Sequence, residues 1–153
     1  MTKLVANSDV KIDKAVRMYV SKVEKEADLS LVDKDITYKK FLSNRMLIVH
    51  SIRRGLPYEI YDLIKERTPF NEEDWAQFLG VSLRTLQRNK SKKDFVFDPI
   101  PTEKILELAE VTALGKEVFD SMIQTYILFV EEILGLEEEK PDDLNASQRC
   151  GGT

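Results

Sequence analysis

The sequence predicts an all-α fold, and three observations favour it. Apolar residues recur at spacings of three and four through most of the 153 residues, and no clean alternation typical of strands appears. Residues that cap helices stand before several of these stretches. The stretch 72–93, EEDWAQFLGVSLRTLQRNKSKK, has the pattern of two short helices joined by a tight turn. We therefore expect a helix-turn-helix domain packed with a C-terminal helical region.

The N-terminal part predicts two helical stretches separated by a connector. The first runs from Asp9 to about Ala27, and residues 28–35, with mixed charge and short apolar groups, form the connector. The predicted inner face of this helix consists of Val10, Ala15, Met18 and Val23. The second stretch runs from about Thr37 to Arg54. Its β-branched cluster, Ile48, Val49 and Ile52, also fits a strand.

Glycine and proline mark the next boundary. Gly55 ends the second stretch, and Pro57 opens a helix that reaches Glu66, because glycine is favoured just past a helix end and proline in a first turn. Asn71 then caps the helix that carries Trp75 and Phe78, which we expect to be buried.

The two helices of the central motif meet at Gly80. The chain bends sharply there, where a residue that tolerates positive φ is favoured, and the small Ala76 lies one turn earlier. Ser82 caps the second helix, on which Leu83 and Leu86 can face the first helix. This is the pattern of a helix-turn-helix that reads DNA.

The C-terminal part predicts further helices. Residues 94–101 form an apolar loop that folds back on the core, and Thr102 caps a helix that Gly115 bends rather than ends. A last helix, from about Ser121 to Leu134, is apolar on nearly all sides. Such a helix must be covered, so it lies either inside the domain or in an interface with a subunit or partner. Residues 145–153 are expected to be a disordered tail.

Composition excludes several classes of protein. The single cysteine, Cys150, argues against a disulfide framework, and the N-terminus lacks the apolar core of a signal peptide. The longest apolar region, 122–134, is interrupted by polar residues and is shorter than the ~20 residues that a membrane span needs. We therefore expect a cytoplasmic protein without a membrane-spanning segment.

Charge is divided unevenly along the chain. Its 27 acidic and 23 basic residues give a formal net charge of −4, but the second helix of the motif and the residues just after it carry no acid. A basic face of this kind is typical of contact with phosphates and base edges. The predicted DNA-binding residues are Ser82, Arg84, Thr85, Gln87, Arg88, Lys90, Lys92 and Lys93.

The arginines are the strongest candidates for base contacts. Arg84 and Arg88 can each donate two parallel hydrogen bonds to guanine, whereas Lys90, Lys92 and Lys93 suit the phosphate backbone. A basic helix-loop-helix can also be a merely solvated surface. The spacing of Ala76, Gly80 and Leu86 favours the DNA-binding interpretation.

Enzyme chemistry has little support in the sequence. There is no glycine-rich phosphate loop, no clustered set of metal ligands, and no base for a nucleophile other than the single histidine, His50. We therefore predict no catalytic residue, no metal and no cofactor.

From about Met46 to Leu134 the chain resembles the antitoxins of RES-Xre toxin-antitoxin systems, the Xre/MbcA/ParS-like family. The resemblance rests on IRRGLPYEIYDLI, on FLGVSLRTLQR and on EKILELAEVTALGKEVF, in this order and spacing. It implies an all-helical homodimer that binds operator DNA of its own operon and neutralises a RES-type toxin that consumes NAD. The pattern departs from the family at its toxin-facing end. The stretch from Leu136 to Glu139, which joins the turn at Leu134 and Gly135 to the segment after it, is longer than expected, and there is no apolar helix from Asn145 onward.

We expect the following domain organisation. Residues 1–35 hold an N-terminal helix and connector with a role in dimerisation, 36–98 the Xre-like helix-turn-helix domain, and 99–144 the C-terminal helical toxin-binding region. Predicted partner-binding residues there are Met122, Tyr126, Phe129, Ile133 and Lys140. Two alternatives stay open, a helix-turn-helix transcriptional regulator and a protein-interaction module, neither of which neutralises a toxin.

Overall fold

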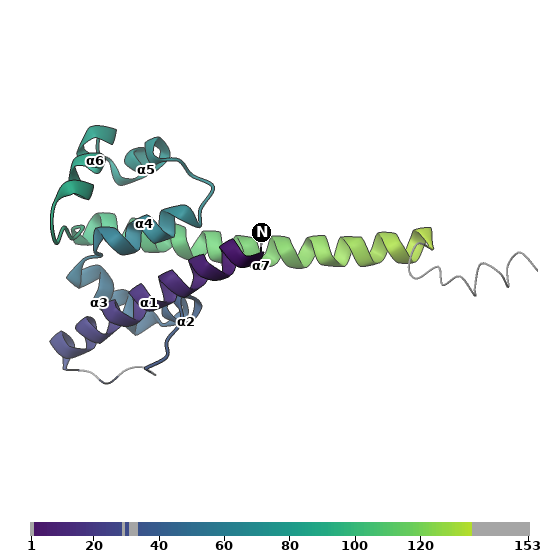
Figure 1. Cartoon of the computed structure of the whole chain (residues 1–153), viewed down its shortest axis with the longest axis horizontal. Helices are drawn as coiled ribbons and strands as arrows, with labels where there is room; N and C mark the ends of the chain where they lie inside the picture. The colour runs from purple at the N-terminus through teal and green to yellow at the C-terminus, as the bar shows by residue number, and fades with distance from the viewer. Residues whose placement is uncertain (1, 29, 31–33, 136–153) are drawn as a thin grey trace, which may run out of the picture. The chain divides into compact units, whose positions relative to one another are not determined.

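The structure is a computed structural model that describes residues 2–28, 30 and 34–135 (Figure 1). Its helices are α1 (Thr2–Ala27), α2 (Tyr38–Ser43), α3 (Arg45–Arg54), α4 (Tyr58–Glu66), α5 (Glu72–Leu79), α6 (Leu83–Ser91) and α7 (Pro99–Leu134). The described residues contain no strand beyond an isolated bridge between Pro57 and Val96, so the predicted all-α class is confirmed. The predicted disordered tail, 145–153, lies outside the described residues.

Contacts divide the chain into two units, Met1–Ala113 and Leu114–Thr153, each of which is described by itself. The first unit holds α1 to α6 and the beginning of α7, and it contains the core. The largest fully buried side chains include Trp75, Tyr61, Phe41 and Ile105. The ring centroid of Tyr61 lies 5.4 Å from that of Trp75 and 5.1 Å from that of Phe97. These edge-to-face contacts join α4, α5 and the segment before α7.

The predicted inner face of α1 was correct only in part: Val23 is buried and Ala15 is half-buried, but the other two members are exposed. Val10 and Met18 are 65% and 59% exposed. The buried face instead consists of Ile12, Val16, Tyr19, Val20 and Val23. This second stripe follows the helical period more closely, and it carries Tyr19, whose ring meets Phe41 of α2 edge to face. The helix also begins earlier than the predicted Asp9.

The predicted stretch from Thr37 to Arg54 is two helices, because Asn44 interrupts it. Its side chain accepts a hydrogen bond from the backbone of Leu47 at 3.2 Å, which caps α3, while its own N–H donates to Phe41 of α2. The β-branched cluster at Ile48, Val49 and Ile52 is helical, so the strand alternative is excluded. The backbone N–H of Tyr38 donates to Asp13 at 2.8 Å and ties α2 to α1.

Three segments converge at the junction between α3 and α4. Gly55 adopts a φ of 92°, and its carbonyl accepts a hydrogen bond from the hydroxyl of Tyr19 at 2.8 Å. The next residue, Leu56, donates its N–H to the hydroxyl of Thr102 at 3.1 Å and accepts from Phe97 at 2.9 Å. The junction therefore joins α1 and the start of α7 through buried polar contacts.

The segment between α6 and α7 folds back on the core only in part. Phe97 is buried as predicted, Phe95 is half-buried, and Val96 is 44% exposed. The bridge to Pro57 explains the pattern, because successive side chains of an extended segment point to opposite sides.

Helix α7 is continuous from Pro99 to Leu134, without the separate last helix expected from Ser121 (Figure 1). Gly115 does not end it, as predicted. In the first unit Thr102, Ile105, Leu106 and Ala109 are buried. From Leu114 onward nearly every described side chain is exposed. The second unit therefore consists, in its described part, of an uncovered apolar helix.

Candidate nucleic-acid interface

Helices α5 and α6 form a helix-turn-helix. Gly80 takes the left-handed conformation, with φ 66° and ψ 29°, and Val81 donates its N–H to Ala76 at 3.0 Å to close the end of α5. Ala76 is only 4% exposed, so a larger residue there would hold the two helices apart. The predicted turn is confirmed in its residues and in its geometry.

Both helices begin at strong caps. Asn71 and Asp74 form a reciprocal capping box at α5, with the side chain of Asn71 accepting from the backbone of Asp74 at 2.8 Å. The hydroxyl of Ser82 accepts from the backbone of Thr85 at 3.1 Å at the start of α6. These local hydrogen bonds satisfy backbone N–H groups in the first turn of each helix.

One side of α6 faces the core. Leu86 is 1% exposed, Leu83 is half-buried, and Asn89 is 8% exposed. Trp75 of α5 is fully buried, as predicted, but Phe78 is 37% exposed, so its predicted burial was wrong. Phe78 rests at the edge of the core against Phe70, with ring centroids 5.1 Å apart. Asn89 was not singled out by the sequence because a polar residue on a basic helix looks solvated.

The predicted DNA-binding residues occupy different positions on and around α6. Exposed side chains on the helix are Arg84, Gln87, Arg88 and Lys90, and Lys92 and Lys93 are exposed just beyond its end. Ser82 is the exposed cap, and the hydroxyl of the half-buried Thr85 lies 2.9 Å from the hydroxyl of Ser82. The ammonium of Lys92 lies 5.6 Å from the centre of the Phe95 ring.

A charged cluster connects this motif to α4. The ammonium of Lys65 lies 3.0 Å from Asp62 and 3.0 Å from Glu72, the first residue of α5. Burial alone lowers the pKa of Lys65, but the hydrogen bonds and charges of the two carboxylates raise it above its usual value. Lys65 in turn holds the pKa of Glu72 below its ordinary value, with smaller contributions from Gln87 and Lys90. Sequence analysis missed this cluster, whose only local signal is the spacing of Asp62 and Lys65.

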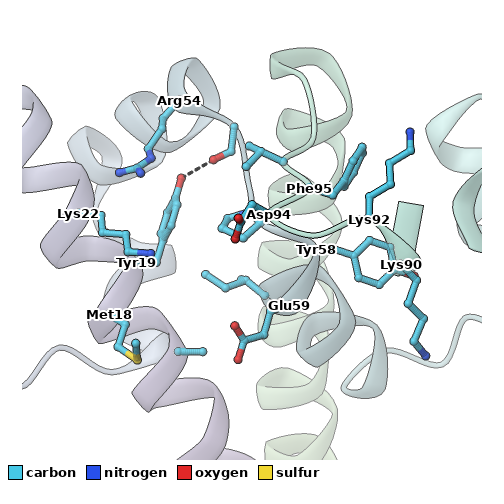
Figure 2. A pocket seen from close by; sticks show the side chains of 15 residues that line it. Met18, Tyr19, Lys22, Arg54, Tyr58, Glu59, Lys90, Lys92, Asp94 and Phe95 are labelled. Atoms are coloured by element: carbon cyan, nitrogen blue, oxygen red, sulfur yellow. Dashed lines mark hydrogen bonds between the residues drawn. The ribbon is translucent and has the colours of Figure 1, made fainter. Parts of the chain in front are cut away.

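A cleft of about 580 Å³ lies beside the end of α6. Figure 2 shows Met18, Tyr19 and Lys22 of α1 on one side and Tyr58, Lys90, Lys92 and Phe95 on the other. Arg54 lies at its wall, paired with Glu26 at 3.0 Å and positioned over the Tyr19 ring. The cleft carries both Lys22 and the carboxylates of Glu59 and Asp94, so its charge is mixed.

The described part of the predicted partner-binding set lies on one side of α7. Met122, Tyr126, Phe129 and Ile133 follow one another at helical spacing and are 65%, 68%, 58% and 63% exposed. Lys140, the remaining member, lies outside the described residues.

Neither a metal site nor a membrane-spanning helix is found among residues 2–28, 30 and 34–135. No group of three or more His, Cys, Asp and Glu side chains gathers there in a way that suits a metal ion. Within the same residues, none of the helices combines the length and the hydropathy needed to cross a membrane. His50 is half-buried on α3.

Comparison with known proteins agrees with this geometry. Residues 48–110 match the family model of the antitoxin Xre-like helix-turn-helix domain, a segment that extends from Ile48 in α3 to Glu110 in α7. No curated protein and no solved structure matches the chain. The matched segment contains α5, α6 and the turn at Gly80, the parts that the motif needs. Over residues 48–110 the chain is therefore similar to the helix-turn-helix domain of Xre-like antitoxins.

Proposed function

We propose that this protein is the antitoxin of a type II toxin-antitoxin system that represses its own operon and neutralises a RES-type, NAD-consuming toxin. The observation that carries the DNA-binding half is the exposed cationic side of α6 on a firmly capped helix-turn-helix. The toxin half is supported by the family resemblance and by the uncovered apolar side chains of α7. Both activities belong to the cytoplasm, where operator DNA lies.

In this proposal α6 enters the major groove and its arginines read bases. Arg84 and Arg88 are four residues apart and therefore lie on the same side of the helix. A bidentate pair between a guanidinium and guanine discriminates against other bases by roughly 1 to 3 kcal/mol. Lys92 and Lys93 hold phosphates, which adds affinity that falls with salt but little sequence choice.

We expect the protein to bind its operator as a homodimer. Two recognition helices about 34 Å apart match one turn of duplex, so the operator is expected to be roughly palindromic. The side of α7 formed by Met122, Tyr126, Phe129 and Ile133 serves as the surface for a second copy or for the toxin. These four large apolar side chains are exposed along one line of the helix and can pack against either partner.

The DNA-binding half is tested with the double variant Arg84→Ala, Arg88→Ala. We expect it to abolish a mobility shift on the DNA upstream of its own gene and to leave toxin association unchanged. The matched control is Lys14→Ala, Lys25→Ala, which removes the same charge from exposed positions on α1. Unchanged DNA binding by the arginine variant, or an equal loss in the control, contradicts the assignment.

The toxin half is tested by co-expression with the neighbouring gene, followed by pull-down and a growth assay. Retention of the toxin with rescue of growth supports the proposal. Phe129→Asp places a charge on the apolar side of α7, so it should release the toxin or dissociate the dimer, as measured by light scattering. The exposed Glu117 and Glu132 of α7 show that acids are tolerated elsewhere on this helix, so Ser121→Asp serves as the control.

A second candidate is a DNA-binding regulator without toxin neutralisation, or an interaction module on the same fold. The departure of the sequence from Leu136 onward favours it. If the protein binds the operator but neither captures the toxin nor rescues growth, it is a DNA-binding regulator. If it captures a partner through α7 without any operator binding, it is an interaction module.

A further inference from the structure

The last turn of α4 and the first turn of α5 are joined by a partly buried ion pair. The ammonium of Lys65 lies 3.0 Å from the carboxylate of Asp62 in its own helix and 3.0 Å from that of Glu72, across the link to α5. The Lys65 side chain is only 16% exposed, so water and salt screen these contacts less than they screen a surface ion pair. The pair therefore fixes Glu72 against the end of α4.

A second set of contacts holds α5 one turn further on. The indole N–H of Trp75 donates to the hydroxyl of Thr68 at 3.3 Å, and that hydroxyl donates to the backbone carbonyl of Lys65 at 2.8 Å. Trp75 is fully buried, and its ring meets Tyr61 of α4 edge to face. Because Glu72 and Trp75 are three residues apart, both anchors lie on one side of α5 and together set its tilt against α4.

Helix α6 follows any movement of α5. The backbone hydrogen bond from Val81 to Ala76, at 3.0 Å, closes the turn between the two helices, and Leu86 of α6 is only 1% exposed. The angle at which the exposed Arg84 and Arg88 meet a duplex is therefore decided where α5 is attached to α4.

We propose that Lys65 and Glu72 are positioning residues: their ion pair sets the angle of α5 and α6 to α4, and with it the fit of Arg84 and Arg88 to base edges. The proposal rests on the proposed DNA-binding function and adds a determinant of sequence choice that does not touch DNA. The Lys65 ammonium is engaged by two carboxylates, so it does not serve as a phosphate contact. Glu72 repels phosphates, so its removal acts on DNA binding in opposite directions through position and through charge.

The ratio of the affinities for two duplexes separates position from charge. One duplex is the DNA upstream of the protein's own gene, and the other has a random sequence of the same length. Glu72→Met removes an acid, so affinity for the random duplex should stay or rise slightly, because that binding depends on phosphates. Affinity for the operator duplex should fall at least about fivefold, the smallest loss expected when one bidentate base contact is misaligned. For a wild-type protein that prefers the operator duplex, an unchanged ratio or an equal fall on both duplexes overturns the proposal.

Glu73 provides the matched control, because it is exposed on the same turn of α5 and has the same charge. Glu73→Met should leave the ratio of affinities at its wild-type value, and an equal fall there overturns the proposal. Lys65→Arg keeps the cation and should keep the ratio, whereas Lys65→Met should lower it. If Lys65 acts through Glu72, the variant with both methionines should be no worse than Lys65→Met alone. Effects that multiply would show that the two residues act separately, which rejects the pair.

A second readout does not depend on DNA. Residual dipolar couplings of the backbone amides measure the angle between α4 and α6, while thermal unfolding shows that each variant is folded. The angle should change in Glu72→Met and stay the same in Glu73→Met, and an unchanged angle in Glu72→Met rejects the positioning role. If the angle changes but the wild-type protein binds the operator duplex no more tightly than the random one, the positioning contact stands and the proposed DNA-binding function fails instead.

Discussion

Gly55 lies just before α4, beside Tyr19 of α1 and the segment before α7. A Cβ atom placed on it would lie 2.3 Å from the carbonyl oxygen of Phe97 and 2.6 Å from a methyl carbon of Val96. Its φ of 92° adds a second penalty for any side chain. The Phe97 carbonyl cannot withdraw cheaply, because it is backbone that also accepts a hydrogen bond from Thr102.

We therefore predict that Gly55→Ala lowers the free energy of unfolding by about 3 kcal/mol or more, from the backbone conformation and the overlap together. Urea denaturation followed by circular dichroism measures this change. Gly80→Ala is the matched control, since Gly80 has a similar φ of 66° but no atom within 4 Å of the added carbon. Its cost should stay near about 1 to 2 kcal/mol, and equal losses in the two variants would refute the role of the close contact.

Sequence analysis located Gly55 correctly as the end of a helix, because that signal is local. It did not anticipate the close approach, since Tyr19 and Phe97 come from distant parts of the chain. The same limit applies at Glu72, whose adjacent acids were visible while its contact with Lys65 required the packing of α5 against α4. Local conformations were predictable, and contacts between segments were not.

At the scale of the helix, the stability of α6 depends on its N-cap residue, Ser82. Ser82 was predicted both to cap the helix and to contact DNA, and its hydroxyl accepts from Thr85 at 3.1 Å. Ser82→Ala should cost about 1 kcal/mol in the free energy of unfolding because one backbone donor of the first turn loses its acceptor. Ser91→Ala, at the exposed far end of α6, should change stability by less than about 0.5 kcal/mol.

Ser82→Asp separates the two roles of this residue. Aspartate is an equally good cap, so unfolding in urea should match the wild type, while its negative charge should weaken a mobility shift on operator DNA. A variant that binds DNA as well as the wild type would place Ser82 away from the phosphates.

Helix boundaries that have a strong local sequence signal were predicted better than those that do not. Asn71, Gly80 and Ser82 act within one turn of themselves, and the ends that they predict for α5 and α6 are the ends observed. The buried face of α1 had two competing stripes, and only the contact of Tyr19 with Phe41 and Gly55 decides between them. Asn44 was missed because its capping role becomes visible only once α2 and α3 are separate helices.

For the first unit taken whole, buried tyrosines predict a loss of stability in alkali. Burial raises the pKa of Tyr38 to about 12, against the opposing charge of Arg67, and burial also raises the pKa of Tyr61. The folded state favours the neutral phenol over the phenolate. The resulting contribution to the free energy of unfolding is fully present below pH ~10, the pKa of tyrosine in the unfolded chain, and it is lost as the pH rises toward 12. For Tyr38 alone the loss amounts to roughly 3 kcal/mol.

The free energy of unfolding measured in urea at pH 8, 10 and 11 checks this prediction. Tyr38→Phe cannot ionise, so its stability should decline less over that interval than the wild type's. Tyr126→Phe, on the exposed part of α7, should follow the wild-type curve. A decline of the same size in Tyr38→Phe and the wild type would mean that another group is responsible.

The exposed length of α7 has a consequence for how long the chain survives. Helical segments that bury little of their apolar surface open locally at small cost, and proteases cut such open forms. From Met122 to Ile133 most of the large apolar side chains are 43% to 68% exposed, so cleavage of the lone chain should begin there. A bound partner that covers this helix lowers the open population in proportion to its occupancy. Copies without a partner would then be the first to be degraded, and the amount of the protein would follow the amount of whatever covers α7.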